Sequence, residues 1–180
     1  MKKLLLSCNY SNSIVADQMA KTLSEHFSKE IVILNIGTNK HIHDTLGPLV
    51  GTMLNNNGFR FPVYGTLDNP VDNSNIIETI KKLYLKYGEN LFILAIDACY
   101  AEGMDGTISL RNSAIKPGTS VRDSFIGVGD MSIIGVVNSF YKKHPMVEDF
   151  DIVADLAKVI SNILMKAQDN YLGLVEKYSA

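Results

Sequence analysis

The sequence predicts an α/β protein, a doubly wound three-layer sandwich with a mostly parallel sheet. Three apolar runs at 31–36, 91–96 and 131–137 indicate strands covered on both faces, because none shows the alternation of a strand with one solvated face. Segments with helical spacing separate these runs, and strands alternating with helices at such lengths are typical of this fold class. We expect the 180 residues to form one domain.

Helices are predicted wherever apolar residues recur at intervals of three or four. Val15, Met19 and Leu23 fall on one side of the first such segment, and the same rule continues in three others. The four predicted helices are 14–27, 46–54, 74–88 and 149–167, the last with an extension to 178 left open. We expect them to cover the two faces of the sheet.

Two further segments are predicted as strands. The short run 61–64 precedes a loop rich in Gly, Asn, Asp and Pro. Residues 107–111 alternate between polar and apolar, as a half-exposed strand does, so we expect an edge or antiparallel strand there.

Composition and charge exclude several classes of function. Hydrophobic residues make up 46% of the chain and charged residues 20%, and a net charge of -2 offers no field that would recruit nucleic acid or an anionic membrane. Cys8 and Cys99 form neither a disulfide framework nor a paired zinc motif, which favours a reducing cytoplasm. Residues 1–8 resemble a lipoprotein leader, but their three leucines fall short of its apolar core of about 7 to 15 residues. No stretch approaches the roughly 20 apolar residues that span a bilayer.

Common cofactor and hydrolase motifs are absent from the sequence. Gly37 follows a strand, yet its loop has neither the three-glycine pattern of a dinucleotide site nor the Gly-Lys-Ser/Thr of a phosphate loop. Residues 118–122 lack the second glycine of a serine hydrolase elbow. We therefore expect no cofactor.

Two aspartates follow strands that could lie side by side. Asp44 comes after the run 31–36, and Asp97 comes directly after 91–96. Ligands of open parallel sheets bind outside the carboxyl ends of the strands, so both carboxylates would share one cleft if the strands are parallel neighbours. Two close carboxyl groups cannot both ionise cheaply, and one would keep a proton while the other acts as a base. Such a pair can activate a water molecule and polarise a carbonyl group.

Each aspartate also has a plain structural interpretation. Asp44 or Thr45 can cap the helix that follows, and Asp97 can lie in a turn at the end of its strand. His43 could join Asp44 and Asp97 as a zinc or nickel ligand, although we expect no resident metal. Cys99 has no base placed beside it by the sequence, which favours packing over nucleophilic chemistry.

Six segments carry motifs in a recognisable order. They include Asp-Thr-Leu-Gly-Pro-Leu-Val-Gly and Val-Tyr-Gly-Thr-Leu-Asp-Asn-Pro-Val, and they are 36–39, 44–51, 63–71, 96–99, 116–121 and 128–133. Together they resemble the YyaC-type sporulation peptidases of spore-forming Firmicutes. That family is similar, more distantly, to the spore germination protease and to the hydrogenase maturation endopeptidases, which share a phosphorylase/hydrolase-like α/β fold.

The resemblance implies roles for particular residues. An aspartate in a similar Asp-x-Leu-Gly-Pro stretch and another at an Asp-Ala strand end are catalytic in the germination protease, which implies that Asp44 and Asp97 are catalytic here. The residues that would line the substrate cleft, small enough to let a peptide backbone approach, are Gly37, Thr38, Gly65, Thr66, Gly118 and Ser120.

The expected function is a sporulation-associated endopeptidase acting on a protein or peptide in the cytoplasm of the forespore or mother cell. Self-association into a homo-oligomer is left open. One alternative is a nickel-probing maturation-type protease with Asp44, Asp97 and His43 as ligands. Another is a non-catalytic sporulation factor that uses the same fold to bind peptides.

Overall fold

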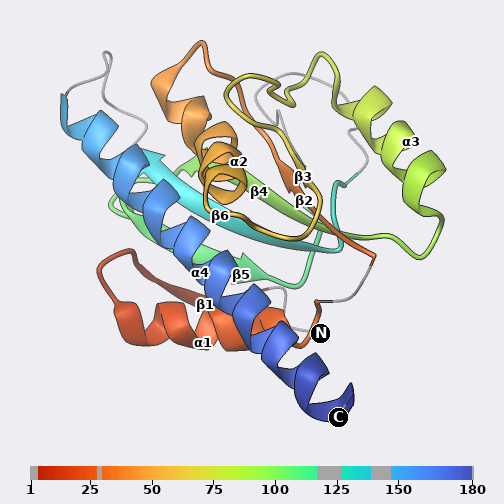
Figure 1. The fold of residues 1–180 in the computed structure, drawn as a ribbon. Helices are drawn as coiled ribbons and strands as arrows, with labels where there is room; N and C mark the ends of the chain where they lie inside the picture. The colour runs from red at the N-terminus through yellow and green to blue at the C-terminus, as the bar shows by residue number, and fades with distance from the viewer. Residues whose placement is uncertain (1–3, 28–29, 117–126, 139–146, 180) are drawn as a thin grey trace.

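The computed structural model describes residues 4–27, 30–116, 127–138 and 147–179 (Figure 1). Within them, one six-stranded sheet has the strand order β1-β5-β6-β4-β2-β3. The strands are β1 (Leu4–Asn9), β2 (Ile31–Asn35), β3 (Val63–Tyr64), β4 (Phe92–Tyr100), β5 (Thr107–Arg111) and β6 (Met131–Asn138). From β6 to β3 all neighbouring strands are parallel, whereas β5 is antiparallel to both β1 and β6.

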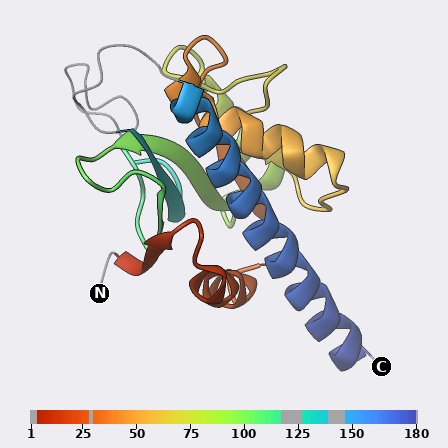
Figure 2. The same cartoon turned by 90° about the vertical axis from the view of Figure 1, so that its left-hand side faces the viewer.

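Helices cover both faces of this sheet, which confirms the predicted three-layer α/β sandwich. α1 (Ser13–Ser24), α2 (Leu46–Asn56) and α4 (Val147–Ser179) lie on one face, and α3 (Ile76–Tyr87) lies on the other (Figures 1 and 2). β2 shows why both faces are needed, because Ile31 and Ile33 join the first core cluster while Val32 and Leu34 join the second. Each of these side chains is fully buried, at about 1.5 to 3 kcal/mol of hydrophobic stabilisation apiece.

Three features of the sheet differ from the sequence predictions. β4 continues through Asp97 to Tyr100 because β6 pairs alongside it, so Asp97 lies within a strand opposite Ile134 and not in a turn. β5 is antiparallel as predicted but is not an edge, since β1 pairs with its other side. β1 itself is an additional strand: its three consecutive leucines are too short an apolar run to predict it, and its residues are largely exposed.

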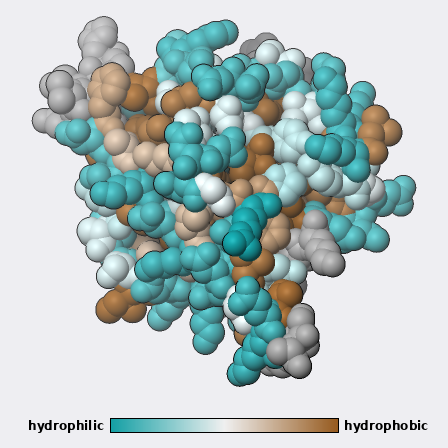
Figure 3. Space-filling view, in the orientation of Figure 1, coloured by the Kyte–Doolittle hydropathy of each residue, from teal (hydrophilic) through white to brown (hydrophobic). Residues whose placement is uncertain are grey.

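The surface carries several large apolar side chains, among them Ile14 and Leu85. On the face shown in Figure 3, apolar residues are interspersed with hydrophilic ones, as on most globular proteins. The C-terminal end of α4 projects beyond the sheet (Figures 1 and 2), and its residues past Gln168 are mostly exposed. Among the described helices, none has both the length and the apolar character required to cross a membrane.

Candidate active site

Asp44 lies in a single 3-10 turn, η1 (Ile42–Thr45), between the end of β2 and the start of α2. Backbone hydrogen bonds fix this turn: the Asp44 N–H donates to the His41 carbonyl (3.0 Å), and the Asp44 carbonyl accepts from the Thr38 N–H (3.0 Å). The Thr45 hydroxyl is directed back to the carbonyls of His41 and Thr38, at 2.9 and 3.2 Å. The backbone around the half-buried Asp44 is therefore held on both sides.

The helix-cap interpretation of these residues is wrong. Thr45 occupies the N-cap position of α2 without a side-chain capping bond, because its hydroxyl bonds to the preceding loop. Asp44 lies one residue earlier, inside η1. The Asp44 carboxyl group is thus not committed to the first turn of the helix.

Two glycines bring this turn against the end of β2. Gly37 has a φ of +144°, and a Cβ built there would lie 2.0 Å from the carbonyl oxygen of Asp44. A Cβ on Gly47 would lie 2.2 Å from the carbonyl oxygen of Ile36. Any side chain at either position would push the Asp44 turn or the start of α2 away from the sheet.

Asp97 is placed by β4, whose parallel neighbour is β2. Asn35, the last residue of β2, lies opposite Ile96, and β4 continues in the same direction to Tyr100, so Asp97 lies one residue beyond the carboxyl end of β2. The carboxyl group of Asp97 accepts a hydrogen bond from the Ala98 N–H at 2.9 Å. The two strands are parallel neighbours, the condition on which the prediction of a shared cleft rests.

The electrostatic surroundings of Asp97 are unusual for a carboxyl group. Burial raises the pKa of Asp97 from 3.8 to about 7, the bond from the Ala98 N–H opposes that shift, and the charge of Asp44 raises the pKa further. Asp44 and Asp97 therefore interact electrostatically although 52 residues separate them. A carboxyl group that titrates near neutrality can both accept and return a proton under cellular conditions.

The raised pKa of Asp97 should make the free energy of unfolding depend on pH. Between about pH 4 and pH 7 folded Asp97 holds a proton that the unfolded chain releases, so the free energy of unfolding falls as pH rises through that window. Asp97→Asn removes this dependence while keeping an acceptor for the Ala98 N–H. We expect the variant to gain roughly 2 to 3 kcal/mol over the wild type between about pH 4.5 and pH 8.5, measured by urea unfolding.

The control for this measurement is Asp169→Asn, an exposed carboxylate near the far end of α4. A stability difference between Asp97→Asn and the wild type that stays constant across the pH range would contradict the raised pKa. If Asp169→Asn showed the same pH-dependent gain in stability as Asp97→Asn, the gain would be due to the change in net charge.

The side chains that follow Asp97 have structural roles. The ring of Tyr100 meets that of His43 edge to face, with 5.6 Å between ring centroids. Burial raises the pKa of the Cys99 thiol, an effect that Arg111 opposes and Asp97 increases. Cys99 packs against the core cluster on the α3 side of the sheet, in agreement with the packing interpretation.

The alternative metal set does not assemble. Among the described residues, no three His, Cys, Asp or Glu side chains are arranged to hold a metal ion. Asp44, Asp97 and His43 all belong to that part of the chain, and the His43 ring packs against Tyr100 instead. The described side chains thus offer no ligand trio for nickel or zinc.

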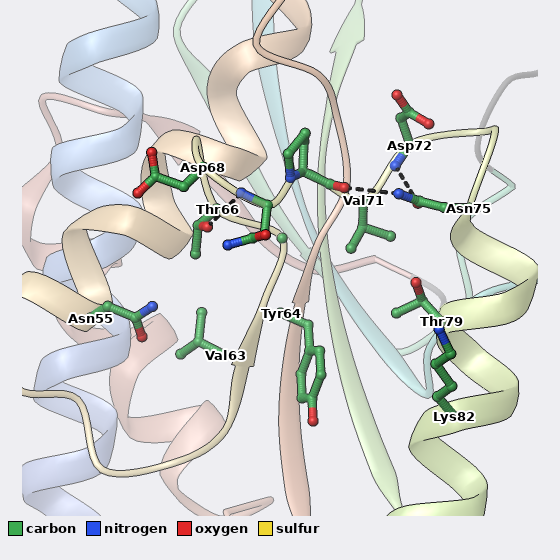
Figure 4. Close-up of a pocket in the computed structure, with 13 residues that line it drawn as sticks. Asn55, Val63, Tyr64, Thr66, Asp68, Val71, Asp72, Asn75, Thr79 and Lys82 are labelled. Carbon is green, nitrogen blue, oxygen red and sulfur yellow. Dashed lines mark hydrogen bonds between the residues drawn. The ribbon is translucent and has the colours of Figure 1, made fainter.

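The predicted cleft residues fall into three groups. Gly37 and Thr38 lie in the loop that holds Asp44, and Gly65 and Thr66 line a separate pocket of about 580 Å³ beside β3 (Figure 4). Gly118 and Ser120 lie outside the described residues. Internal packing requires glycine at positions 37 and 65, because the protein's own backbone occupies the space that a Cβ would need. Contact of these residues with a substrate stays a prediction.

No sequence motif indicates the opposite wall of this pocket. That wall includes Thr79 and Lys82 of α3, and Asn55 of α2 contributes at the other side. In the sequence these residues belong to ordinary polar faces of helices. In this region the sequence predicted only Gly65 and Thr66 as cleft residues.

Comparison with known families adds to this geometry. A family model described as "Protein of unknown function (DUF1256)" matches residues 7–163, which include every described strand from β2 to β6 and both aspartates. The chain belongs to the DUF1256 family. This DUF1256 protein is 33% identical over 148 residues to the protein YyaC of Bacillus subtilis (strain 168), a match that covers 79% of the chain and 72% of YyaC.

A solved structure shares the fold of the DUF1256 chain. It is the [NiFe] hydrogenase maturation protease HycI from Thermococcus kodakarensis KOD1, with a TM-score of 0.51 and 19% sequence identity over 80% of this chain and 99% of HycI. At this identity the likeness is one of fold. It confirms the predicted relation of the architecture to the maturation endopeptidases.

Proposed function

We propose that this DUF1256 protein is an endopeptidase that hydrolyses a peptide bond in a protein substrate with a water molecule held between Asp44 and Asp97. The observation that carries the proposal is the pKa of Asp97 near 7, raised by burial and by the charge of Asp44. Two interacting carboxyl groups, one of which keeps a proton near neutrality, are the minimum that general acid-base hydrolysis needs. The protease fold of HycI supports the same assignment.

The pKa of Asp97 suggests how the two roles divide. Protonated Asp97 donates a hydrogen bond to the carbonyl oxygen of the scissile peptide, while Asp44 takes a proton from the water that attacks the carbonyl carbon. As the tetrahedral intermediate collapses, the proton on Asp44 passes to the departing amine. General acid-base assistance of this kind typically contributes about 10² to 10⁴ in rate.

The proposal extends to the setting of the protein. The resemblance of its loops to the sporulation peptidases, together with the match to YyaC of a Bacillus, supports a role in sporulation in the cytoplasm of the forespore or mother cell. A protein or peptide is the substrate, and no cofactor takes part.

The test is to incubate the purified protein with an extract of sporulating cells and to identify new protein N-termini by chemical labelling and mass spectrometry. The double variant Asp44→Asn/Asp97→Asn serves as the inactive control. We expect a reproducible set of termini that the wild type generates and the double variant does not. Identical sets from the two proteins would contradict the proposal.

A further inference from the structure

Among the described strands, none pairs with the outer edge of β3. β3 is the last strand of the sheet, with β2 as its partner. On that side, the Pro62 carbonyl accepts a hydrogen bond from the Ile33 N–H (2.9 Å), and the Tyr64 carbonyl accepts one from the Asn35 side-chain amide (2.9 Å). Alternate residues of a strand direct their backbone groups to the same neighbour, so the N–H and carbonyl of Val63 point away from β2.

The pocket of about 580 Å³ runs along this edge. Asn55 of α2 lies at one side of it and Thr79 and Lys82 of α3 at the other, with Tyr64 between them (Figure 4). A volume of this size lies within the range of about 300 to 1,000 Å³ that is usual for binding sites. We call this pocket the β3 groove.

Hydrogen bonds within the protein pre-form one end of the β3 groove. The Asn75 side-chain amide donates to the Pro70 carbonyl and its oxygen accepts from the Asp72 N–H, each at 3.0 Å, and the Thr66 hydroxyl accepts from the Asn69 N–H at 3.1 Å (Figure 4). A loop held in this way loses little conformational freedom when a ligand binds.

Three charged residues line the β3 groove, and two are engaged elsewhere. Lys82 forms an ion pair with Glu78 at 2.7 Å, and the Asp72 carboxylate accepts bonds from the N–H and hydroxyl of Ser74. Asp68 presents an exposed carboxylate at the rim. Two carboxylates, Asp68 and Asp72, against the single Lys82 leave the lining with a net negative charge, so a basic side chain is the ligand group that this rim favours.

We propose that the β3 groove binds an extended peptide segment as an added strand on β3, with a lysine or arginine side chain directed to Asp68. Such strand addition uses main-chain hydrogen bonds for affinity and side-chain pockets for specificity. The inference rests on the proposed peptidase function, because the bound segment is part of the protein substrate.

The spacing of the strands also determines the distance from the β3 groove to the strand that carries Asp97. An added strand would lie three strand spacings from β4, or about 14 Å at about 4.8 Å each. An extended chain covers this distance in roughly four to five residues. We therefore expect cleavage about that many residues from the segment that occupies the groove.

Binding is tested by titrating the ¹⁵N-labelled full chain with two end-blocked synthetic octapeptides, Gly-Thr-Val-Lys-Val-Thr-Gly-Ser and the same peptide with Glu for Lys. We expect amide shifts to concentrate on β3, the loop 65–72 and the groove side of α3. The Lys peptide should bind roughly threefold to fivefold more tightly, and Asp68→Asn should remove this preference. Shifts confined to other regions would overturn the inference.

Two variants test the mode of binding. Val63→Pro removes the N–H that points away from β2, which an edge strand tolerates, and Thr79→Arg fills the groove from α3. Each should weaken both peptides by at least about tenfold, because main-chain pairing or space is lost. The matched control is Leu85→Arg, which adds the same side chain to α3 at an exposed position outside the groove and should leave binding unchanged. Unchanged binding in Thr79→Arg overturns the inference even if Val63→Pro does not fold.

The same peptides and variants test the β3 groove and the peptidase activity independently. If the protein binds the peptide at β3 but cleaves no substrate, peptide binding in the groove is supported and the peptidase proposal is contradicted. Cleavage that is unaffected by Thr79→Arg would retain the peptidase and contradict the groove. Cleavage sites at no fixed distance from a basic residue would also contradict the groove.

Discussion

Asp44→Asn and Asp97→Asn are each expected to lower the rate of peptide cleavage by at least about 10²-fold. Asparagine keeps the size of each side chain but can neither accept the proton of the attacking water nor exchange one with a carbonyl oxygen. The rates are to be measured on peptides that contain the cleavage sites found in the cell extract. Because the two carboxyl groups act as one unit, the double variant should be little slower than either single variant.

The matched control is Asp169→Asn, which removes an exposed carboxylate from the far part of α4 and should keep full activity. Circular dichroism and urea unfolding establish that each variant is folded. If either Asp44→Asn or Asp97→Asn retained activity within a few-fold of the wild type, the proposed pair would be wrong.

Gly65→Ala is expected to cause the largest loss of stability. The φ of Gly65 is +80°, which costs an L-residue about 1 to 2 kcal/mol, and its Cβ would lie 1.9 Å from the carbonyl oxygen of Asn35. That oxygen belongs to the backbone of a buried strand and cannot move aside, so overpacking adds about 1 to 3 kcal/mol or more. We expect a total loss of roughly 3 to 5 kcal/mol in the free energy of unfolding, a large part of the 5 to 15 kcal/mol typical of a domain.

Gly88→Ala is the matched control for this substitution. Gly88 has a similar φ of +86° at the end of α3, and a Cβ there meets nothing within 4 Å. Its ψ of -179° places it in a region that is essentially restricted to glycine, so Gly88→Ala should lose only the conformational part, about 1 to 3 kcal/mol. Equal losses in the free energy of unfolding of the two variants, measured by urea unfolding, would show that the contact with Asn35 does not affect stability.

The reason for this sensitivity is the position of Gly65 where three elements meet. A Cβ on Gly51 of α2 would lie 2.1 Å from the Gly65 carbonyl oxygen, so β2, the end of β3 and α2 touch through backbone atoms. The side chain of Asn35 is buried there and bonds to the Tyr64 carbonyl. The same junction supports the β3 groove and, through Gly47 and Ile36, the turn that carries Asp44.

Only part of the candidate site could be predicted from the sequence. The positions of Asp44 and Asp97 after two apolar runs were enough to predict that they lie at one edge of a parallel sheet. The sequence predicted that one of the two carboxyl groups keeps a proton but not which one, because the pKa of Asp97 depends on burial by residues remote in the chain and on the charge of Asp44. The β3 groove was missed for a related reason, since α2 and α3 supply its walls.

The sequence by itself determined the helices, the buried parallel strands and the fold class. Apolar residues at intervals of three or four define the helices, and uninterrupted apolar runs define β2, β4 and β6. These are local properties, since each pattern lies within one continuous segment of chain.

Tertiary structure decided what depends on pairing between distant segments. β4 extends through Asp97 because β6 lies beside it, and β1 is a strand because β5 offers an unpaired edge. Thr45 leaves its expected capping role because the 38–41 backbone accepts its hydroxyl. Hydrogen bonds, burial and charge interactions depend on which atoms meet in space, and local residue patterns do not contain that information.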